Sequence, residues 1–168
     1  RPETPAMKIG TLVHAAILEP EVFYLDYAIF SGDRRTKAGK EEWSSLMAEG
    51  FIPVTSAEFE MAERMNESVR KLEGVQEALD ECMFEASCFY QDPTTGAACR
   101  FRPDAWHKEN DVIYDVKTCQ DASPQAFAKD MAKFGYHIQA AHYCEGVAQI
   151  TGVWPRFIFL AVEKEAPY

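Results

Sequence analysis

A nearly continuous apolar run, RFIFLAV, occupies residues 156–162 near the end of the sequence. Such a run fits a β-strand that is buried on both faces better than a strand with one solvated face. A strand of this kind needs helices packed over its sheet, and helix-like segments occur both before and after the other strand candidates. We therefore expect an α/β fold with a mixed central sheet flanked by helices.

The helix candidates are separated by proline and glycine. Pro20 stops the first, Pro53 breaks the chain before the third, and Ser123-Pro124 reads as an N-cap followed by proline at the first helical position. Trp43, Leu46 and Met47 are expected on the inner side of the second. The predicted helices cover residues 8–19, residues 40–49, a long stretch from an N-cap at Ser56 towards Leu72 or Leu79, residues 123–134 and residues 137–150.

Three strand candidates lie between these helices, at residues 83–90, 97–105 and 111–118. Short polar turns connect them, and short turns favour an antiparallel meander. Because residues two apart in a strand point to the same face, Arg100, Arg102 and Asp104 are expected on one face.

Acidic side chains end two neighbouring strands of this meander. Asp115 and Lys117 project together from the third strand, and strand pairing can place Asp104 near Asp115, although the register is not fixed by the sequence. Two carboxylates in one site repel unless a cation neutralises them, and oxygen ligands select Mg²⁺ or Mn²⁺. The pattern predicts a metal-dependent nuclease, while a solvated strand edge remains the plainer interpretation of an isolated D-x-K.

Other polar residues have two interpretations each. Gln139 and Tyr143 are neighbours one turn apart on a helix, where they line a cleft or a half-exposed face. His14 lies in an apolar helix, where it is either a metal ligand or a core residue whose polar atoms are hydrogen-bonded. Glu85 is either a carboxylate of the active site or a solvated residue at a strand edge. Arg34, Arg35 and Lys37 lie in a basic loop that contacts a DNA backbone or only water.

Composition narrows the classes of function. The chain has 168 residues, 47% hydrophobic residues and a formal net charge of −10, which suits one globular domain and counts against a general polyanion binder. No apolar run approaches the ~20 residues of a membrane helix.

Five cysteines without a CxxC pair indicate reduced thiols in the cytoplasm. We expect a single nuclease domain over residues 1–168. The missing initiator methionine suggests either a processed chain or a fragment shortened at one or both ends.

Several motifs follow one another in a recognisable order. They are Gly10-Thr11, His14, Leu18-Glu19-Pro20-Glu21, Arg35-Thr36-Lys37-Ala38-Gly39-Lys40, Glu85, Cys99-Arg100, Arg102-Pro103-Asp104, Asp115-Val116-Lys117-Thr118, Gln139 and Tyr143. Together they resemble the PD-(D/E)XK nuclease superfamily and, within it, the RecE-type (exonuclease VIII-like) group of phages and prophages. The resemblance runs from about residue 9 to about residue 162.

The resemblance implies a restriction-endonuclease-like core and a Mg²⁺-dependent exodeoxyribonuclease, with Mn²⁺ as a substitute, that degrades linear double-stranded DNA from 5′ to 3′. It maps His14, Asp104, Asp115 and the backbone carbonyl of Val116 to metal ligands, and Lys117 to the catalytic lysine. Relatives form rings around DNA and work with a single-strand annealing protein in phage recombination, which is carried over by analogy only.

The same resemblance gives roles to further residues. Gln139 and Tyr143 match a helix motif that supports the site and contacts the DNA end, and Glu85 matches an acidic position near the metal. Arg100 and Arg102 are candidates for phosphate contacts, because guanidinium groups match phosphate oxygens.

Alternatives stay open at this point. A structure- or sequence-selective endonuclease on the same fold would cut closed circular DNA, whereas an exonuclease needs an end. A catalytically inactive DNA-end-binding module would fail to bind Mg²⁺. Iron–sulfur nucleases with this motif order need four cysteines bracketing the core, which the cysteine positions here do not provide.

Overall fold

The computed structural model describes residues 4–109 and 111–168. Contacts within the chain divide it into two compact units, one up to Ser68 and one from Val69 on. The expectation of a single nuclease domain over residues 1–168 stays a prediction. The α/β fold class is confirmed, because the second unit contains a mixed sheet packed against helices.

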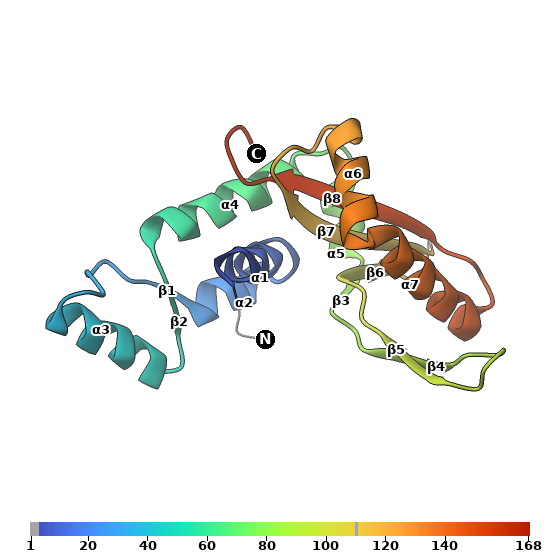
Figure 1. Ribbon diagram of the computed structural model, residues 1–168, viewed down its shortest axis with the longest axis horizontal. Coiled ribbons are helices and arrows are strands. Elements are labelled where there is room, and N and C mark those ends of the chain that lie inside the picture. Colours follow the sequence, from blue (N-terminus) through green and yellow to red (C-terminus); the bar gives the residue numbers. More distant parts are fainter. Residues whose placement is uncertain (1–3, 110) are drawn as a thin grey trace. The chain divides into compact units, whose positions relative to one another are not determined.

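The first unit consists of helices and a pair of short parallel strands (Figure 1). Pro20 does end the first helix as predicted, but it also opens a second helix, where the missing N–H of proline is no loss. The elements are α1 (Pro5–Leu18), α2 (Pro20–Asp26), β1 (Tyr27–Ile29), α3 (Lys37–Ala48), β2 (Ile52–Val54) and α4 (Ser56–Arg70), whose last residues cross into the second unit.

Two helix starts differ from the sequence prediction. Thr55, not Ser56, caps α4: its hydroxyl accepts the Glu58 N–H at 3.2 Å, while the Glu58 carboxylate accepts the Thr55 N–H at 2.8 Å. This reciprocal pair is a capping box.

α3 begins at Lys37 and is capped by Thr36. The prediction that Met47 lies on the inner side of this helix is wrong, because Met47 is exposed.

The second unit carries the mixed sheet (Figure 1). Its strands pair in the order β3-β6-β7-β8, with β7 parallel to β8 and antiparallel to β6. A separate hairpin pairs β4 with β5. The elements are α5 (Val75–Asp80), β3 (Met83–Phe84), β4 (Cys88–Gln91), β5 (Ala98–Phe101), β6 (Ala105–His107), β7 (Val112–Cys119), α6 (Pro124–Phe134), α7 (Tyr136–Thr151) and β8 (Arg156–Glu163).

The predicted meander is therefore broken up. The first candidate splits into β3 and β4 at Glu85, whose φ of 50° lies in the left-handed region. The second splits into β5 and β6 at Arg102-Pro103-Asp104, because Pro103 has no N–H for a strand ladder. The predicted long helix also divides: Gly74, with φ of 74°, separates α4 from α5.

Helices α6 and α7 connect β7 to β8 and pack against the sheet (Figure 1). The ring of Phe159 lies 5.6 Å from Phe127 of α6, and the ring of Phe157 lies 6.3 Å from Tyr143 of α7. β8 is half-buried along most of its length rather than buried throughout. This packing holds α7 against the sheet next to β7.

Candidate active site

The break before β6 places a carboxylate against β7. Ala105 pairs with Tyr114 as the last pair of the antiparallel ladder, so the register continued by one residue brings Asp104 opposite Asp115. The Asp104 Oδ2 accepts a hydrogen bond from the Val116 N–H at 2.7 Å. A side chain thus satisfies a buried backbone donor of β7 that lies beyond the end of the ladder with β6.

Asp115 lies at the centre of the cluster and is fully buried. Its Oδ1 accepts a hydrogen bond from the Gln139 side-chain amide at 2.8 Å, and its Oδ2 forms an ion pair with the Lys117 ammonium. A buried carboxylate is stable only when such partners compensate for lost hydration. The predicted common face of Asp115 and Lys117 is present, and α7 contributes Gln139 to it.

Lys117 contacts an aromatic ring that the sequence reasoning missed. Its ammonium nitrogen lies 5.0 Å from the centroid of the Tyr136 ring, a cation–π distance. Burial, followed by the charges of Asp130 and Asp115, raises the pKa of the Tyr136 phenol. An aromatic three residues before Gln139 shares its helix face, so helical spacing alone could have suggested this residue.

Glu85 adds an acidic group beside Asp104. A carboxylate oxygen of Glu85 lies within 4.8 Å of one from Asp104, and the Glu85 N–H donates to the Asp104 carbonyl at 3.1 Å. The Arg102 guanidinium ion-pairs with the same Glu85 carboxylate. Carboxylate oxygens at this spacing are a possible acidic metal-binding group, and hard cations such as Mg²⁺ prefer oxygen ligands.

The expectation that Arg100, Arg102 and Asp104 share one strand face is wrong. Asp104 is buried, whereas both arginines are exposed. The alternation stops because the chain leaves β5 at Phe101 and turns at Pro103 before β6 begins.

Tyr143 and Arg100 lie outside this group of contacts. Tyr143 packs in the core, 5.6 Å from the Phe101 ring. Arg100 is exposed on β5, and Val116 is buried with its N–H on Asp104. His14 is a half-buried residue of α1 in the first unit.

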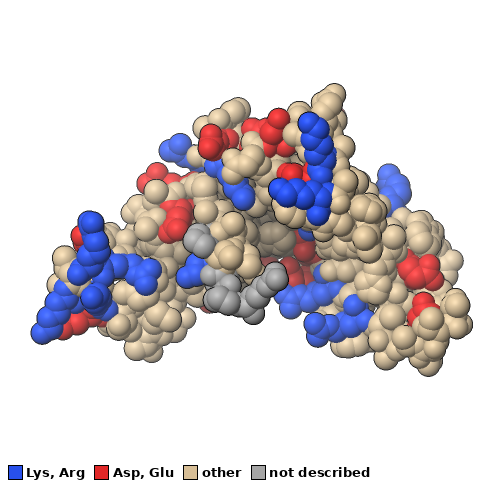
Figure 2. Space-filling model, viewed as in Figure 1, with Lys and Arg blue, Asp and Glu red and all other residues tan. Residues whose placement is uncertain are grey.

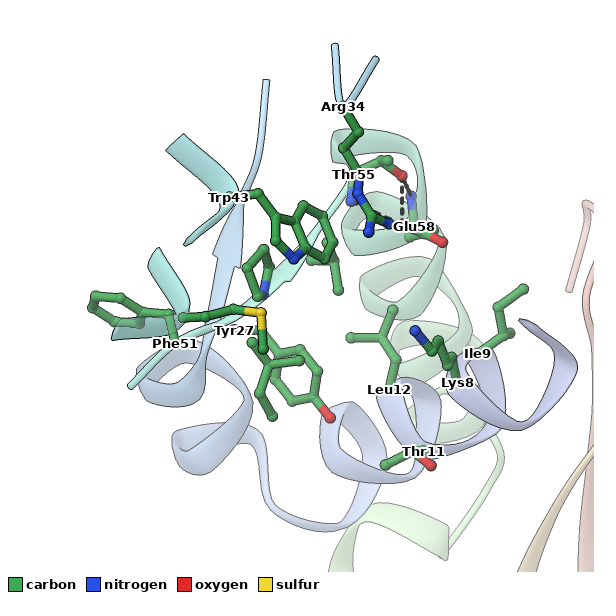
Figure 3. Close-up of a pocket in the computed structure, with 14 residues that line it drawn as sticks. Lys8, Ile9, Thr11, Leu12, Tyr27, Arg34, Trp43, Phe51, Thr55 and Glu58 are labelled. Carbon is green, nitrogen blue, oxygen red and sulfur yellow. Dashed lines mark hydrogen bonds between the residues drawn. The ribbon is translucent and has the colours of Figure 1, made fainter. Parts of the chain in front are cut away.

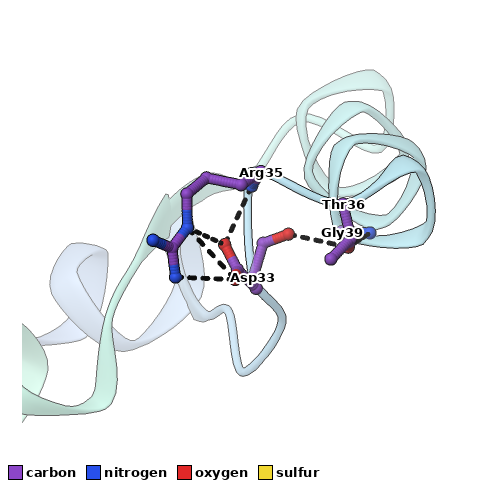
Figure 4. A network of polar contacts seen from close by, with 4 residues as sticks. All are labelled: Asp33, Arg35, Thr36 and Gly39. Atoms are coloured by element: carbon purple, nitrogen blue, oxygen red, sulfur yellow. Dashed lines mark hydrogen bonds and ion pairs between the residues drawn. The ribbon is translucent and has the colours of Figure 1, made fainter.

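The predicted DNA-contact loop also belongs to the first unit. Figure 2 shows Lys and Arg side chains gathered over α3 and the segment before it, where Arg34, Arg35, Lys37 and Lys40 lie. Figure 4 shows that Arg35 is engaged within the loop: its guanidinium donates to both carboxylate oxygens of Asp33, the shortest contact being 3.0 Å.

A proline-aspartate turn, a D-x-K strand and a helix glutamine around a mixed sheet define a PD-(D/E)XK-type domain. The chain belongs to the family described as "PDDEXK-like domain of unknown function (DUF3799)", whose sequence profile matches residues 1–168. This membership confirms the predicted superfamily and supports a nuclease.

One solved structure that resembles the chain is a protein from Eubacterium rectale described as a "Putative exonuclease". The two share a TM-score of 0.64 and 17% sequence identity over 99% of this chain and 57% of that one, so the likeness shows the fold alone. The chain spans less than two thirds of that protein.

No curated protein matches the chain. Within the described residues, no helix is long and apolar enough to cross a membrane.

Proposed function

We propose that the chain is a Mg²⁺-dependent exodeoxyribonuclease that degrades linear double-stranded DNA. The observation that carries the proposal is the buried Asp115 carboxylate held between Lys117 and Gln139, with the Asp104 carboxylate bonded to the N–H of the next residue, Val116. A purely structural sheet has little reason to keep two carboxylates and a lysine in its interior, since buried charges need compensation.

Oxygen ligands suit Mg²⁺, with Mn²⁺ as a substitute. Asp104 and Asp115 are the proposed ligands, with Glu85, His14 and the Val116 carbonyl as further candidates from the resemblance. When bound, the ion would supply a water of lowered pKa and a polarised scissile phosphate.

The residues of the chain have separate proposed tasks. Lys117 orients the attacking water and offsets negative charge on the phosphate in the transition state. Gln139 fixes the rotamer of Asp115 through its amide hydrogen bond, and Tyr136 holds the Lys117 ammonium in place. Arg100, with its exposed side chain, is proposed to contact a DNA phosphate, whereas Arg102 would share its guanidinium between Glu85 and DNA.

Finer properties come from the resemblance to the RecE-type group. They are 5′ to 3′ digestion, a role in phage or prophage recombination, a ring-shaped homo-oligomer and a single-strand annealing partner. A cytoplasmic location is proposed separately, from the cysteines without a CxxC pair. Each remains a proposal about the whole protein.

The test compares two matched substitutions that remove one carboxylate each. Asp115→Asn keeps the side-chain shape but removes the charge, and digestion of linear duplex in Mg²⁺ should fall by about a thousandfold, as for loss of other central groups in hydrolytic sites. Asp111→Asn is the control, because Asp111 precedes β7 in a left-handed conformation, φ of 49°, that Asn tolerates. Full activity in the Asp115 variant contradicts the site assignment.

The substrate decides between the nuclease classes. An exonuclease should leave covalently closed circular duplex intact and degrade the same DNA after linearisation. Release of a label from the 5′ end before one from the 3′ end gives the direction. Cutting of the closed circle contradicts the exonuclease proposal and supports an endonuclease.

A further inference from the structure

The first unit contains a pocket of about 380 Å³ between α1, α3 and β2 (Figure 3). This volume lies in the range of about 300–1,000 Å³ that is usual for ligand sites. One wall is formed by Met47, Phe51 and Ile52, all of which are exposed. Exposed apolar side chains gathered around a concavity indicate a binding surface rather than ordinary surface composition.

Arg34 lies over an aromatic ring of the same pocket. Its guanidinium carbon is 3.9 Å from the centroid of the Trp43 ring, and the Phe30 ring packs against that indole at 5.2 Å. Figure 3 shows the guanidinium between Trp43 and the first turn of α4. Stacking fixes the plane of a guanidinium while its N–H groups stay available for an anion.

The charges around the pocket favour an anionic ligand. Lys8 of α1 is the second cation in the lining. Within the described part of the chain, neither Arg34 nor Lys8 has an ion pair, whereas Arg35 is bound by Asp33 and Lys37 lies 3.8 Å from Glu41. The acidic residue of the described lining, Glu58, already accepts two hydrogen bonds from Thr55, at 2.8 and 2.7 Å.

The loop that carries Arg34 is held in one conformation. The Thr36 hydroxyl donates to the Asp33 carbonyl at 2.8 Å and accepts the Gly39 N–H at 3.0 Å. The Asp33 carboxylate binds Arg35 as well (Figure 4). Arg34 is thus presented by a loop that does not have to order itself on binding, which lowers the entropic penalty.

We propose that this pocket binds one nucleotide of a DNA strand. The phosphate lies at Arg34 and Lys8, and the base packs against the apolar wall of Met47, Phe51 and Ile52. A DNA strand offers a phosphate and a flat base at neighbouring positions, and proteins hold single strands with a combination of cationic and aromatic side chains. The inference rests on the proposed DNA substrate and adds a strand-binding site to it.

Binding is tested with the full chain and a fluorescently labelled oligothymidylate in buffer without divalent cations, so that no cleavage occurs. Arg34→Ala should raise Kd about tenfold, or about 1.4 kcal/mol. It should also reduce the slope of log K against log salt by about 0.7, the value for one phosphate contact on a single strand. Lys8→Ala should act in the same direction.

Arg64→Ala is the matched control, because it removes the same charge from an exposed position of the first unit outside the pocket, where Glu60 lies 4.0 Å from the guanidinium. It should change Kd less than about twofold, since an exposed, paired charge contributes little. Equal effects of the two arginine substitutions, or no effect of Arg34→Ala, overturn the pocket.

The base is tested with an abasic strand of the same length. Unchanged protein should bind the abasic strand several-fold more weakly, since base–aromatic contacts contribute about 1–3 kcal/mol per base. Equal affinity for both strands overturns the assignment of the apolar wall. Because the assay needs no cleavage, a chain that binds through Arg34 but leaves linear duplex intact contradicts the proposed nuclease and not the pocket.

Discussion

The carboxylate of Asp104 accepts a hydrogen bond from the backbone N–H of Val116, with 2.7 Å between Oδ2 and the nitrogen. The contact joins the turn before β6 to the middle of β7, next to the fully buried Asp115. A proposed metal ligand therefore also has a structural task, and its two tasks can be separated by substitution.

Asp104→Asn and Asp104→Ala should both abolish Mg²⁺-dependent digestion, because neither supplies a carboxylate. They should differ in stability. The Asn amide oxygen can still accept the Val116 N–H, whereas Ala leaves that buried donor unpaired, which costs about 1–3 kcal/mol. Urea denaturation should give a lower midpoint for the Ala variant at an unchanged m-value. Equal midpoints would show that the hydrogen bond does not stabilise the fold.

Tyr136 offers a test of the contact with the Lys117 ammonium. Tyr136→Phe keeps the ring and should keep kcat, whereas Tyr136→Leu removes the cation–π contact of about 0.5–2 kcal/mol. That loss corresponds to a fall in kcat of about 2- to 30-fold with little change in KM. Equal losses in both variants would point to the hydroxyl instead, and a change in KM alone would remove the positioning role.

Cys82 should react slowly with alkylating agents at pH 8. Burial, followed by the charge of Glu81, raises the pKa of its thiol from 9.0 to about 11. The folded chain therefore keeps a proton that the unfolded chain loses, and the free energy of unfolding should fall as the pH rises from about 9.0 to about 11. Mass spectrometry after iodoacetamide treatment, with and without denaturant, measures the difference. Rapid labelling of Cys82 in the folded chain contradicts it.

Gly39 and Gly10 form a matched pair for stability. A Cβ at Gly39 would lie 2.1 Å from the Asp33 carbonyl oxygen, so Gly39→Ala must displace the loop that presents Arg34. A Cβ at Gly10 meets nothing within 4 Å, so Gly10→Ala in α1 should stabilise by about 0.5–1 kcal/mol. Thermal unfolding should show opposite shifts, and a neutral Gly39→Ala would mean that the loop adjusts freely.

Strong local signals allowed the main elements of the fold to be predicted. The apolar run at residues 156–162, the Ser123-Pro124 helix start and the D-x-K strand all have the expected secondary structure. The short elements escaped prediction: α2 is hidden behind a proline, and β1 and β2 are too short to show a period. Pro53 was predicted to break the chain but lies inside β2. A proline fits there because β2 pairs with β1 in a two-stranded sheet, and the other edge of β2 needs no ladder hydrogen bonds.

The candidate site was predictable where its residues share a strand and not where tertiary packing assembles it. Asp115 and Lys117 followed from alternation along one strand. Alternation could not predict that Asp104 is separated from Arg102, because Pro103 changes the direction of the chain between strands. The contact between Lys117 and Tyr136 depends on how α7 packs on the sheet, which no local pattern specifies.

The position of Gln139 on α7, downstream of both carboxylate-bearing segments, has a consequence for biosynthesis. A nascent chain that has left the ribosome only as far as β7 contains Asp104, Asp115 and Lys117 but not α7, whose Gln139 and Tyr136 contact Asp115 and Lys117. We expect the site to be completed only after α7 has been synthesised and packed on the sheet, so that the proposed hydrolysis of DNA cannot begin before that step.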